Sequence, residues 1–396
     1  MNLDFSQALL VLGSLLACAA ALSGWMRASV LSISVLAVVA GIVLAAFDVV
    51  SVDPTSNLVK HVVELALIVT LFSDGLLVER ELLARHWGPP ARALVLAMPI
   101  TLVLLAAFAL VAFPSLAVAE AFLLAAVLTP TDPVVTSTVV TATRVPALVR
   151  HTLNLESGLN DGLALPFVLF FLTLAEPGGH GASAAFELLG KVAVGAAIGL
   201  VLAFVGGRAL TRLPGGGLAR NYEGVYALGL ALAAYGLAQV TYGNGLIAAF
   251  VCGIAMGATE HDVPQGFVEF AENASTILQV ITFFVFGALI VATGFDHSIP
   301  PLVLFVAFAL LVARPVSLML SLLRARIGQP EKLFMAWFGP KGVSSMLFAL
   351  FVLKSAVDNG ELLFDIAAIT IIVSIVVHGL TDTLGARWIS RRAGLD

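Results

Sequence analysis

Charged side chains are scarce in this chain, at 11% of its 396 residues, whereas 60% are apolar. Soluble globular domains carry about a quarter charged residues, so water is excluded as the main solvent of this protein. Apolar runs of about twenty residues recur along the whole length, and each is long enough to cross a hydrocarbon core about 30 Å thick as a helix. Because such helices satisfy their own backbone hydrogen bonds, the sequence predicts an all-α polytopic membrane protein.

Net charge, cysteine and paired histidine are also scarce, and this excludes further classes of function. The net charge is only −5 and no basic block stands out, so nucleic acid is not an expected partner. The two cysteines, Cys18 and Cys252, lie inside apolar runs, where packing explains them. No histidine pair has metal-binding spacing and no nucleophile elbow is present, and His378 is expected to be a packed side chain. We therefore expect neither an enzyme nor a bound cofactor.

The first apolar run is expected to be a membrane helix rather than a cleaved signal. A signal peptide has a positively charged leader. Here Asp4 is the only charge before the run, and Arg27 follows it.

Charged and Gly/Pro-rich breaks divide the chain into thirteen predicted spans with short connections. They cover roughly residues 6–25, 29–48, 58–78, 91–112, 119–142, 150–175, 185–207, 222–241, 244–259, 273–293, 300–323, 333–354 and 362–385. Spans one to six and eight to thirteen then form two halves of opposite orientation, with span seven as the link. This is the arrangement of an inverted repeat.

The basic residues test this count, because lysine and arginine gather on the cytoplasmic side of a membrane protein. Fifteen of the twenty fall on one side, from Arg27 to Arg392. Lys60, Lys191 and Lys354 fall on the other. The N-terminus is therefore expected outside and the C-terminus in the cytoplasm.

Two spans carry proline in their middle, beside a buried charge. The fifth contains Thr129-Pro130-Thr131-Asp132-Pro133, and the twelfth contains Phe338-Gly339-Pro340-Lys341-Gly342. Proline removes a backbone hydrogen bond and breaks a helix. Broken helices at matching positions of two repeats indicate a transporter's binding site near the middle of the membrane. Asp132 and Lys341 are expected to compensate the opposed helix ends there.

The sixth span carries two carboxylates, in Asn154-Leu155-Glu156-Ser157-Gly158-Leu159-Asn160-Asp161-Gly162. Ionisable side chains at membrane depth mark function by default. Asp161 has no basic partner in prospect, so we expect it to bind either a proton or a cation. Ser157, the Thr131 hydroxyl or carbonyl, and Asp132 would supply further hard oxygen ligands for Na⁺, and Asn160 is neutral.

Glu156, by contrast, is expected to pair with a basic residue. Arg314 in span eleven is the preferred partner because its guanidinium is permanently charged and fork-shaped, and Lys341 is the alternative. We expect this pair to clamp two helices without a transport role. Glu64 and Asp74 in span three lie near helix ends and are expected to face water.

Taken together, these motifs resemble those of the sodium/proton antiporters of the NhaP and NHE exchanger type, in the monovalent cation:proton antiporter superfamily. The resemblance covers nearly the whole chain. It implies an NhaA-like fold, a homodimer in the bacterial inner membrane, a role in pH homeostasis, and electroneutral exchange of one Na⁺ or Li⁺ for one proton. The Asn160-Asp161 pair is the feature that implies electroneutrality. Lys341 stands where many relatives carry arginine, and no tail-based regulation is expected.

The resemblance also implies two bundles. Residues 1–78 and 185–259 would mainly form the dimerisation scaffold, and residues 91–175 and 273–385 mainly the mobile core. Two other functions stay open. A K⁺/H⁺ antiporter would differ only in cavity size and ligand geometry, which the sequence does not fix. A sodium-coupled symporter of an organic anion would need extra donors, and Lys341 offers almost the only one.

Overall fold

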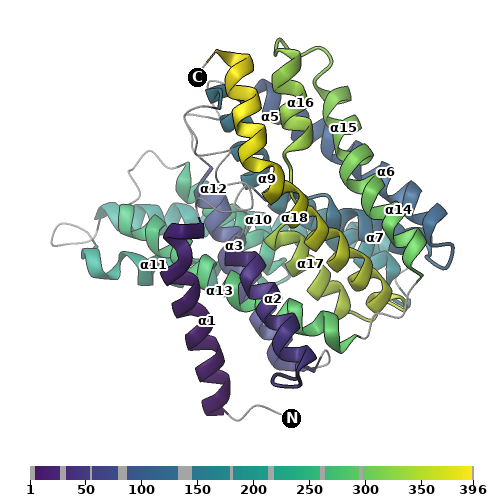
Figure 1. Ribbon diagram of the computed structural model, residues 1–396. Coiled ribbons are helices and arrows are strands. Elements are labelled where there is room, and N and C mark those ends of the chain that lie inside the picture. The colour runs from purple at the N-terminus through teal and green to yellow at the C-terminus, as the bar shows by residue number, and fades with distance from the viewer. Residues whose placement is uncertain are drawn as a thin grey trace.

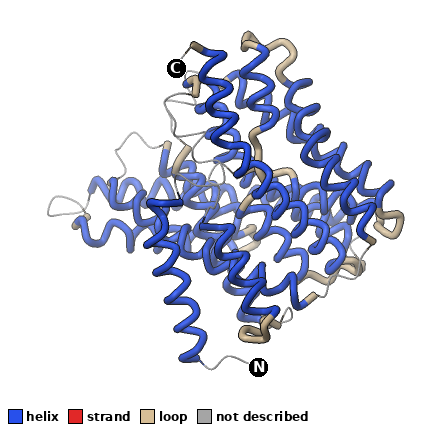
Figure 2. Tube along the Cα trace, viewed as in Figure 1, coloured by secondary structure: helices blue, strands red, loops and turns tan. Residues whose placement is uncertain are grey.

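The computed structural model describes residues 5–26, 33–53, 56–78, 87–132, 145–178, 182–212, 218–258, 264–293 and 298–394. Within these ranges all regular secondary structure is helical and no strand occurs (Figure 2). The predicted all-α class is confirmed.

The helices follow the predicted spans in order. Nine spans are single helices: α1 (Phe5–Met26), α2 (Ile33–Ala46), α3 (Asn57–Leu76), α9 (Ala147–Ala175), α10 (Ala182–Arg212), α11 (Glu223–Val240), α12 (Gly245–Gly257), α13 (Gln265–Ala292) and α18 (Gly360–Ala393). A short 3₁₀ turn, η3 (Arg220–Tyr222), precedes α11.

The other four spans are composite. Two contain a π-helical turn: α5 (Gly88–Arg92), η1 (Ala93–Ala97) and α6 (Met98–Ala112) form one, and α14 (Ile299–Phe308), η4 (Ala309–Ala313) and α15 (Arg314–Ser321) form the other. The remaining two are the broken spans, which consist of α7 (Val118–Leu128) and of α16 (Gln329–Trp337) with α17 (Val343–Leu353).

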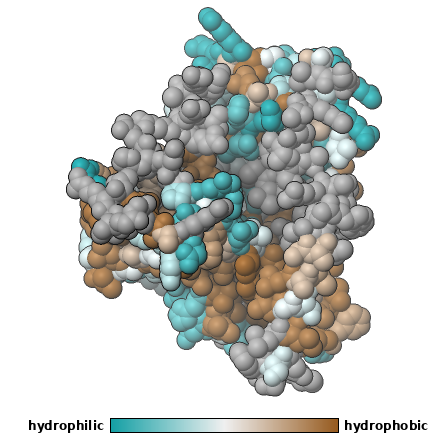
Figure 3. Space-filling model, turned by 90° about the vertical axis from the view of Figure 1, so that its left-hand side faces the viewer, coloured by the Kyte–Doolittle hydropathy of each residue, from teal (hydrophilic) through white to brown (hydrophobic). Residues whose placement is uncertain are grey.

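Seven continuous helical stretches of the described chain are long and apolar enough to cross a membrane. The shorter apolar helices include α7 and α17, which are half-length because each ends or begins at a break. Large apolar side chains such as Val111, Leu200, Phe204 and Leu304 are more than half exposed, as lipid contact requires. On the face in Figure 3 apolar residues gather in the lower part, and hydrophilic residues lie above them.

The first break begins where α7 ends at Leu128, and residues 130–132 are not helical. Pro133 and the rest of the predicted span to residue 142 lie outside the described residues. The second break separates α16 from α17 over residues 338–342. The two breaks meet, because the Asp132 backbone N–H donates to the Pro340 carbonyl at 2.9 Å.

Small residues let the helices approach closely, as is common in membrane bundles. A Cβ on Gly41 of α2 would overlap the Phe284 carbonyl of α13, and one on Gly287 would overlap the Val38 carbonyl. Helix α13 accordingly packs most extensively against α2, and also against α3, while α18 runs beside α17 and α16 (Figure 1). The predicted division into scaffold and core bundles stays a prediction.

Candidate functional site

Both candidate carboxylates belong to helix α9. Glu156 and Asp161 are separated by five residues, which turns their side chains about 140° apart around the helix axis. Both are buried, with 5% and 7% of their surfaces exposed. They therefore face two different environments.

Glu156 lies in a fork-shaped ion pair. Arg314 Nη1 donates to Glu156 Oε1 at 2.7 Å, and Nη2 donates to Oε2 at 3.3 Å. Nη2 also donates to the Phe338 carbonyl at 3.1 Å, which joins the pair to the second break. Gly339 makes room for the guanidinium, since a Cβ there would overlap it. The pair predicted from the sequence is thus present, and it holds α9, α15 and the second break together.

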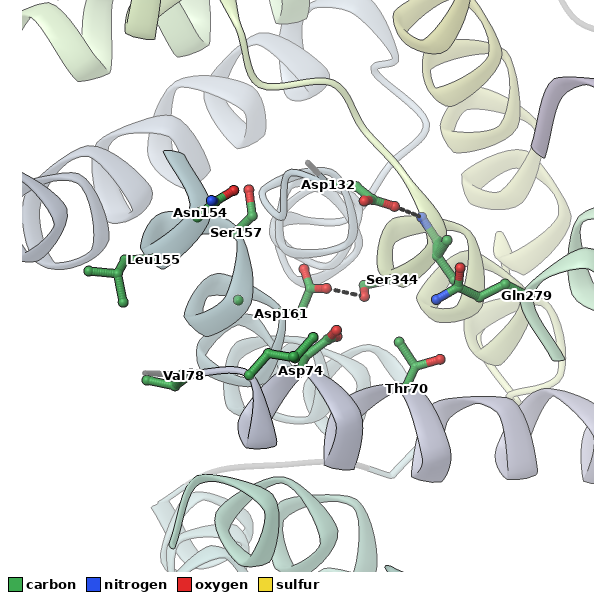
Figure 4. A pocket seen from close by; sticks show the side chains of 13 residues that line it. Thr70, Asp74, Val78, Asp132, Asn154, Leu155, Ser157, Asp161, Gln279 and Ser344 are labelled. Atoms are coloured by element: carbon green, nitrogen blue, oxygen red, sulfur yellow. Dashed lines mark hydrogen bonds between the residues drawn. The ribbon is translucent and has the colours of Figure 1, made fainter. Parts of the chain in front are cut away.

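Asp161 lines a cavity of about 310 Å³ between α3, α9, α13 and the start of α17 (Figure 4). The lining residues are Thr70, Asp74, Leu77, Val78, Asp132, Asn154, Leu155, Ser157, Gly158, Asp161, Gln279, Val343 and Ser344. None of these described lining residues is basic. A positive ion that enters therefore meets oxygen atoms and no competing cationic side chain.

The Asp161 carboxylate is only partly satisfied by the protein. Ser344 donates its hydroxyl to Asp161 Oδ2 (Figure 4). Oδ1 is buried and has no hydrogen-bond donor among the described residues. The Asp74 carboxyl group from α3 lies beside it, and both acids interact electrostatically with Asp132. This oxygen is the atom best placed to accept a proton or to ligate a cation.

The charged side chain of each break lies at a helix end that belongs to the other break. Asp132 Oδ2 accepts the Val343 N–H at 3.0 Å, at the positive N-terminal end of α17. Lys341 Nζ lies 3.4 Å from the Thr129 and Pro130 carbonyls, at the negative C-terminal end of α7. The Lys341 backbone N–H donates to Ser374 Oγ of α18 at 2.9 Å. Each charged residue thus compensates the helix end that belongs to the other break.

The remaining predicted residues divide between two faces of α9. Ser157 lines the Asp161 cavity, one turn before Asp161. Asn160 turns away from it, and its Nδ2 donates to Thr131 Oγ1 at 2.7 Å. Thr131 is not among the residues that line the cavity. Its assignment as a Na⁺ ligand stays a prediction.

Four residues that line the cavity, Asp74, Ser344, Thr70 and Gln279, are not among the site residues that the sequence predicts. Asp74 was expected to face water near a helix end, yet it lies beside Asp161 in the same cavity. Thr70 and Gln279 are tied together through Ser275, with oxygen–oxygen and nitrogen–oxygen distances of 3.1 and 3.0 Å. A signal was available for Ser344, which lies in the first turn after the second break.

Comparisons with known proteins place this geometry in a family. The family model described as the sodium/hydrogen exchanger, transmembrane, matches residues 12–385. The chain is 25% identical over 335 residues to the K(+)/H(+) antiporter NhaP of Alkalimonas amylolytica, covering 82% of this chain and 56% of that protein. It is 26% identical over 363 residues to a probable Na(+)/H(+) antiporter of Schizosaccharomyces pombe, covering 82% and 48%. The chain spans about half the length of these curated relatives.

A solved structure shares the fold. The sodium proton antiporter MjNhaP1 from Methanocaldococcus jannaschii superposes with a TM-score of 0.82 at 20% sequence identity, covering 97% of this chain and 99% of that one. The predicted fold class and the resemblance to exchangers of the NhaP type are confirmed. The chain is an integral membrane protein that belongs to the sodium/hydrogen exchanger family.

Proposed function

We propose that this protein exchanges a monovalent cation for protons across the membrane, and that the two ions compete for Asp161. The observation that carries the proposal is the state of this carboxylate. It is buried, lines a cavity of about 310 Å³, and has one oxygen with no donor among the described residues. A carboxylate locked in an ion pair could not release its partner at each transport cycle.

Competition at one charge is sufficient to couple the two fluxes. With a proton or a cation bound, Asp161 is neutralised and the site can change its access to the two sides. Without either, the bare anion has to be carried through a low-dielectric barrier, which is strongly unfavourable. The empty site therefore stays where it is, and net leakage of either ion is suppressed.

One cation and one proton are then exchanged in each cycle. Asn160 brings no charge and faces away from the cavity. Asp132 is engaged at the start of α17. Asp74 adds a second carboxyl group beside Asp161. The exchange is electroneutral provided that Asp74 keeps one protonation state throughout the cycle.

The oxygens that face the cavity suit an unhydrated alkali ion. Asp161 Oδ1 and the Ser157 hydroxyl are hard ligands on α9, and Asp74 of α3 offers further carboxyl oxygens beside Asp161. We propose Na⁺ or Li⁺ as the transported ion. K⁺ is the second candidate, because relatives named as K(+)/H(+) and as Na(+)/H(+) antiporters both match this chain. An organic anion is disfavoured, since no described lining residue is basic.

We also propose that the protein is a homodimer of the bacterial inner membrane, with its N-terminus outside and its C-terminus in the cytoplasm. The distribution of lysine and arginine supports this orientation.

Purified protein in proteoliposomes with an imposed pH gradient tests the proposal. Addition of Na⁺, Li⁺ or K⁺ in turn should dissipate the gradient, and the ion that acts at the lowest concentration is the substrate. Asp161→Asn should abolish the response to all three. The matched control is Asp358→Asn, the same substitution at an exposed loop position, which should exchange like the wild type. Normal exchange by Asp161→Asn would falsify the proposal.

A further inference from the structure

A second, much smaller cavity lies on the other side of α9. Its volume is about 10 Å³, which is room for about one water molecule. Its lining comes from α9, from the span with η1, from the first break and from Arg314. The lining residues are Ala93, Leu94, Ala97, Met98, Thr101, Thr129, Glu156, Asn160, Arg314 and Leu318.

Two buried polar atoms in this lining have no hydrogen-bond partner among the described residues. They are the acceptor Asn160 Oδ1 and the donor Arg314 Nε. Both residues are more than nine-tenths buried, with 3% and 8% of their surfaces exposed. Their other polar atoms are engaged, because Asn160 Nδ2 donates to Thr131 and both Arg314 Nη atoms donate to Glu156. Buried polar atoms in folded proteins are nearly always paired, directly or through water.

We infer that this cavity binds one ordered water molecule, which accepts the Arg314 Nε–H and donates to Asn160 Oδ1. Size and charge select this ligand. A cavity of about 10 Å³ excludes any larger molecule. The adjacent guanidinium repels a bare cation. Water alone among the abundant small species can accept from one of these atoms and donate to the other.

The backbone around the cavity explains why it exists. Each of the two flanking spans carries a five-residue π-helical turn, η1 and η4, and each turn comes just before a proline, Pro99 or Pro315. A proline cannot donate to the preceding turn, and a π turn widens the helix at that point. Residues of η1 line the cavity directly, and Arg314 follows η4 without a gap. The two turns occupy matching places in the predicted repeats.

The water completes a hydrogen-bonded chain between the two breaks. The chain runs from Thr131 through Asn160 and the water to Arg314, and from Arg314 Nη2 to the Phe338 carbonyl. Asn160 is thus a positioning residue, which fixes the first break relative to the second. The water site itself does not depend on the proposed function, whereas its effect on transport does.

A structure of the whole protein at better than about 2 Å resolution tests the site. The expected result is a density peak within about 3.2 Å of both Asn160 Oδ1 and Arg314 Nε. A map of that quality without the peak, or with the two side chains bonded directly to each other, overturns the inference.

A pair of equally bulky substitutions tests the effect on transport. Ala97 lines the cavity and is 4% exposed, so Ala97→Val should displace the water without replacing its hydrogen bonds. Ala97→Thr has nearly the same volume and brings a hydroxyl group. We expect roughly tenfold slower exchange and a lower unfolding temperature for the valine variant, and values close to wild type for the threonine variant. Equal behaviour of the two variants overturns the role of the water.

The readouts separate this inference from the proposed function. The density peak and the difference in unfolding temperature do not require transport. If wild-type protein exchanged no cation while both of these results were as expected, the proposed function would fail and the water site would stand.

Discussion

Two acids on one helix show how neighbours decide what a carboxylate can do. Glu156 is held by both Nη atoms of Arg314, next to a cavity of about 10 Å³. Asp161 lies one and a half turns further along, faces a cavity of about 310 Å³, and accepts the Ser344 hydroxyl at Oδ2, while its Oδ1 has no donor among the described residues. The first carboxylate is held by a permanently charged guanidinium. In the proposed function, the second is neutralised by an ion from outside.

The proposed function therefore places a stabilising role on one face of α9 and exchange on the other. A buried pair that loses one partner leaves an uncompensated charge, which is strongly destabilising. A buried acid that accepts a proton or a cation loses its charge without any change in the fold. Substitutions on the two faces should therefore differ in kind as well as in size.

The largest effect is expected on the Arg314 side. Arg314→Met removes the ion-pair partner of Glu156 and should lower the free energy of unfolding by about 3–5 kcal/mol. Thermal unfolding in detergent measures this loss. Asp161→Asn should unfold at the wild-type temperature or above, because it removes a buried charge that has no basic partner.

The double variant Glu156→Leu with Arg314→Met sharpens this contrast. Replacing both partners by apolar side chains leaves no stranded charge, so much of the stability should return. If Arg314→Met were as stable as the wild type, the pair would not be the clamp described here.

A smaller effect is expected at Asp74, which lies beside Asp161 in the same cavity. Asp74→Asn replaces a carboxyl group close to Asp161 by a neutral amide and should raise the apparent KM for the cation roughly tenfold. The maximal rate should fall much less, since Asp161 is retained. Initial rates of exchange at varied cation concentration measure both constants. Asp74→Glu keeps the carboxyl group and serves as the control. An unchanged KM in the asparagine variant would show that Asp74 does not act on the bound cation.

The smallest effect is expected from Ser344. Its hydroxyl donates to Asp161 Oδ2, so Ser344→Ala removes one hydrogen bond to the carboxylate and should change the apparent cation affinity a few-fold. The neighbouring Ser345 is a matched control, because its buried hydroxyl has no partner among the described residues. Ser345→Ala should leave the affinity unchanged. Equal effects of the two alanine variants would contradict the hydrogen-bond argument.

Much of the fold could be predicted from the sequence, because each membrane helix can be recognised from its own run of apolar residues. Apolar runs fix the spans, and the prolines in residues 129–133 and 338–342 fix the breaks. The Arg314 partner of Glu156 was also predictable, since few basic residues lie inside spans. Those inferences need only composition and order along the chain.

The neighbours of Asp161 could not be predicted in the same way. Asp74 reaches it from α3 and Ser344 from α17, so their proximity depends on how distant helices pack. Asn160 is adjacent to Asp161 in sequence, yet it faces Thr131 and the smaller cavity. Residue type suggests which side chains can bind an ion, but tertiary packing decides which of them share a cavity.

The pH dependence of the apparent KM for the cation tests the central claim most directly. If protons and cations compete for Asp161, KM should rise about tenfold for each unit by which the pH falls in the acidic range, while the maximal rate at saturating cation stays constant. Initial exchange rates in proteoliposomes over a series of pH values provide both constants. A KM that does not change with pH, with a maximal rate that falls instead, would contradict competition at a single carboxylate.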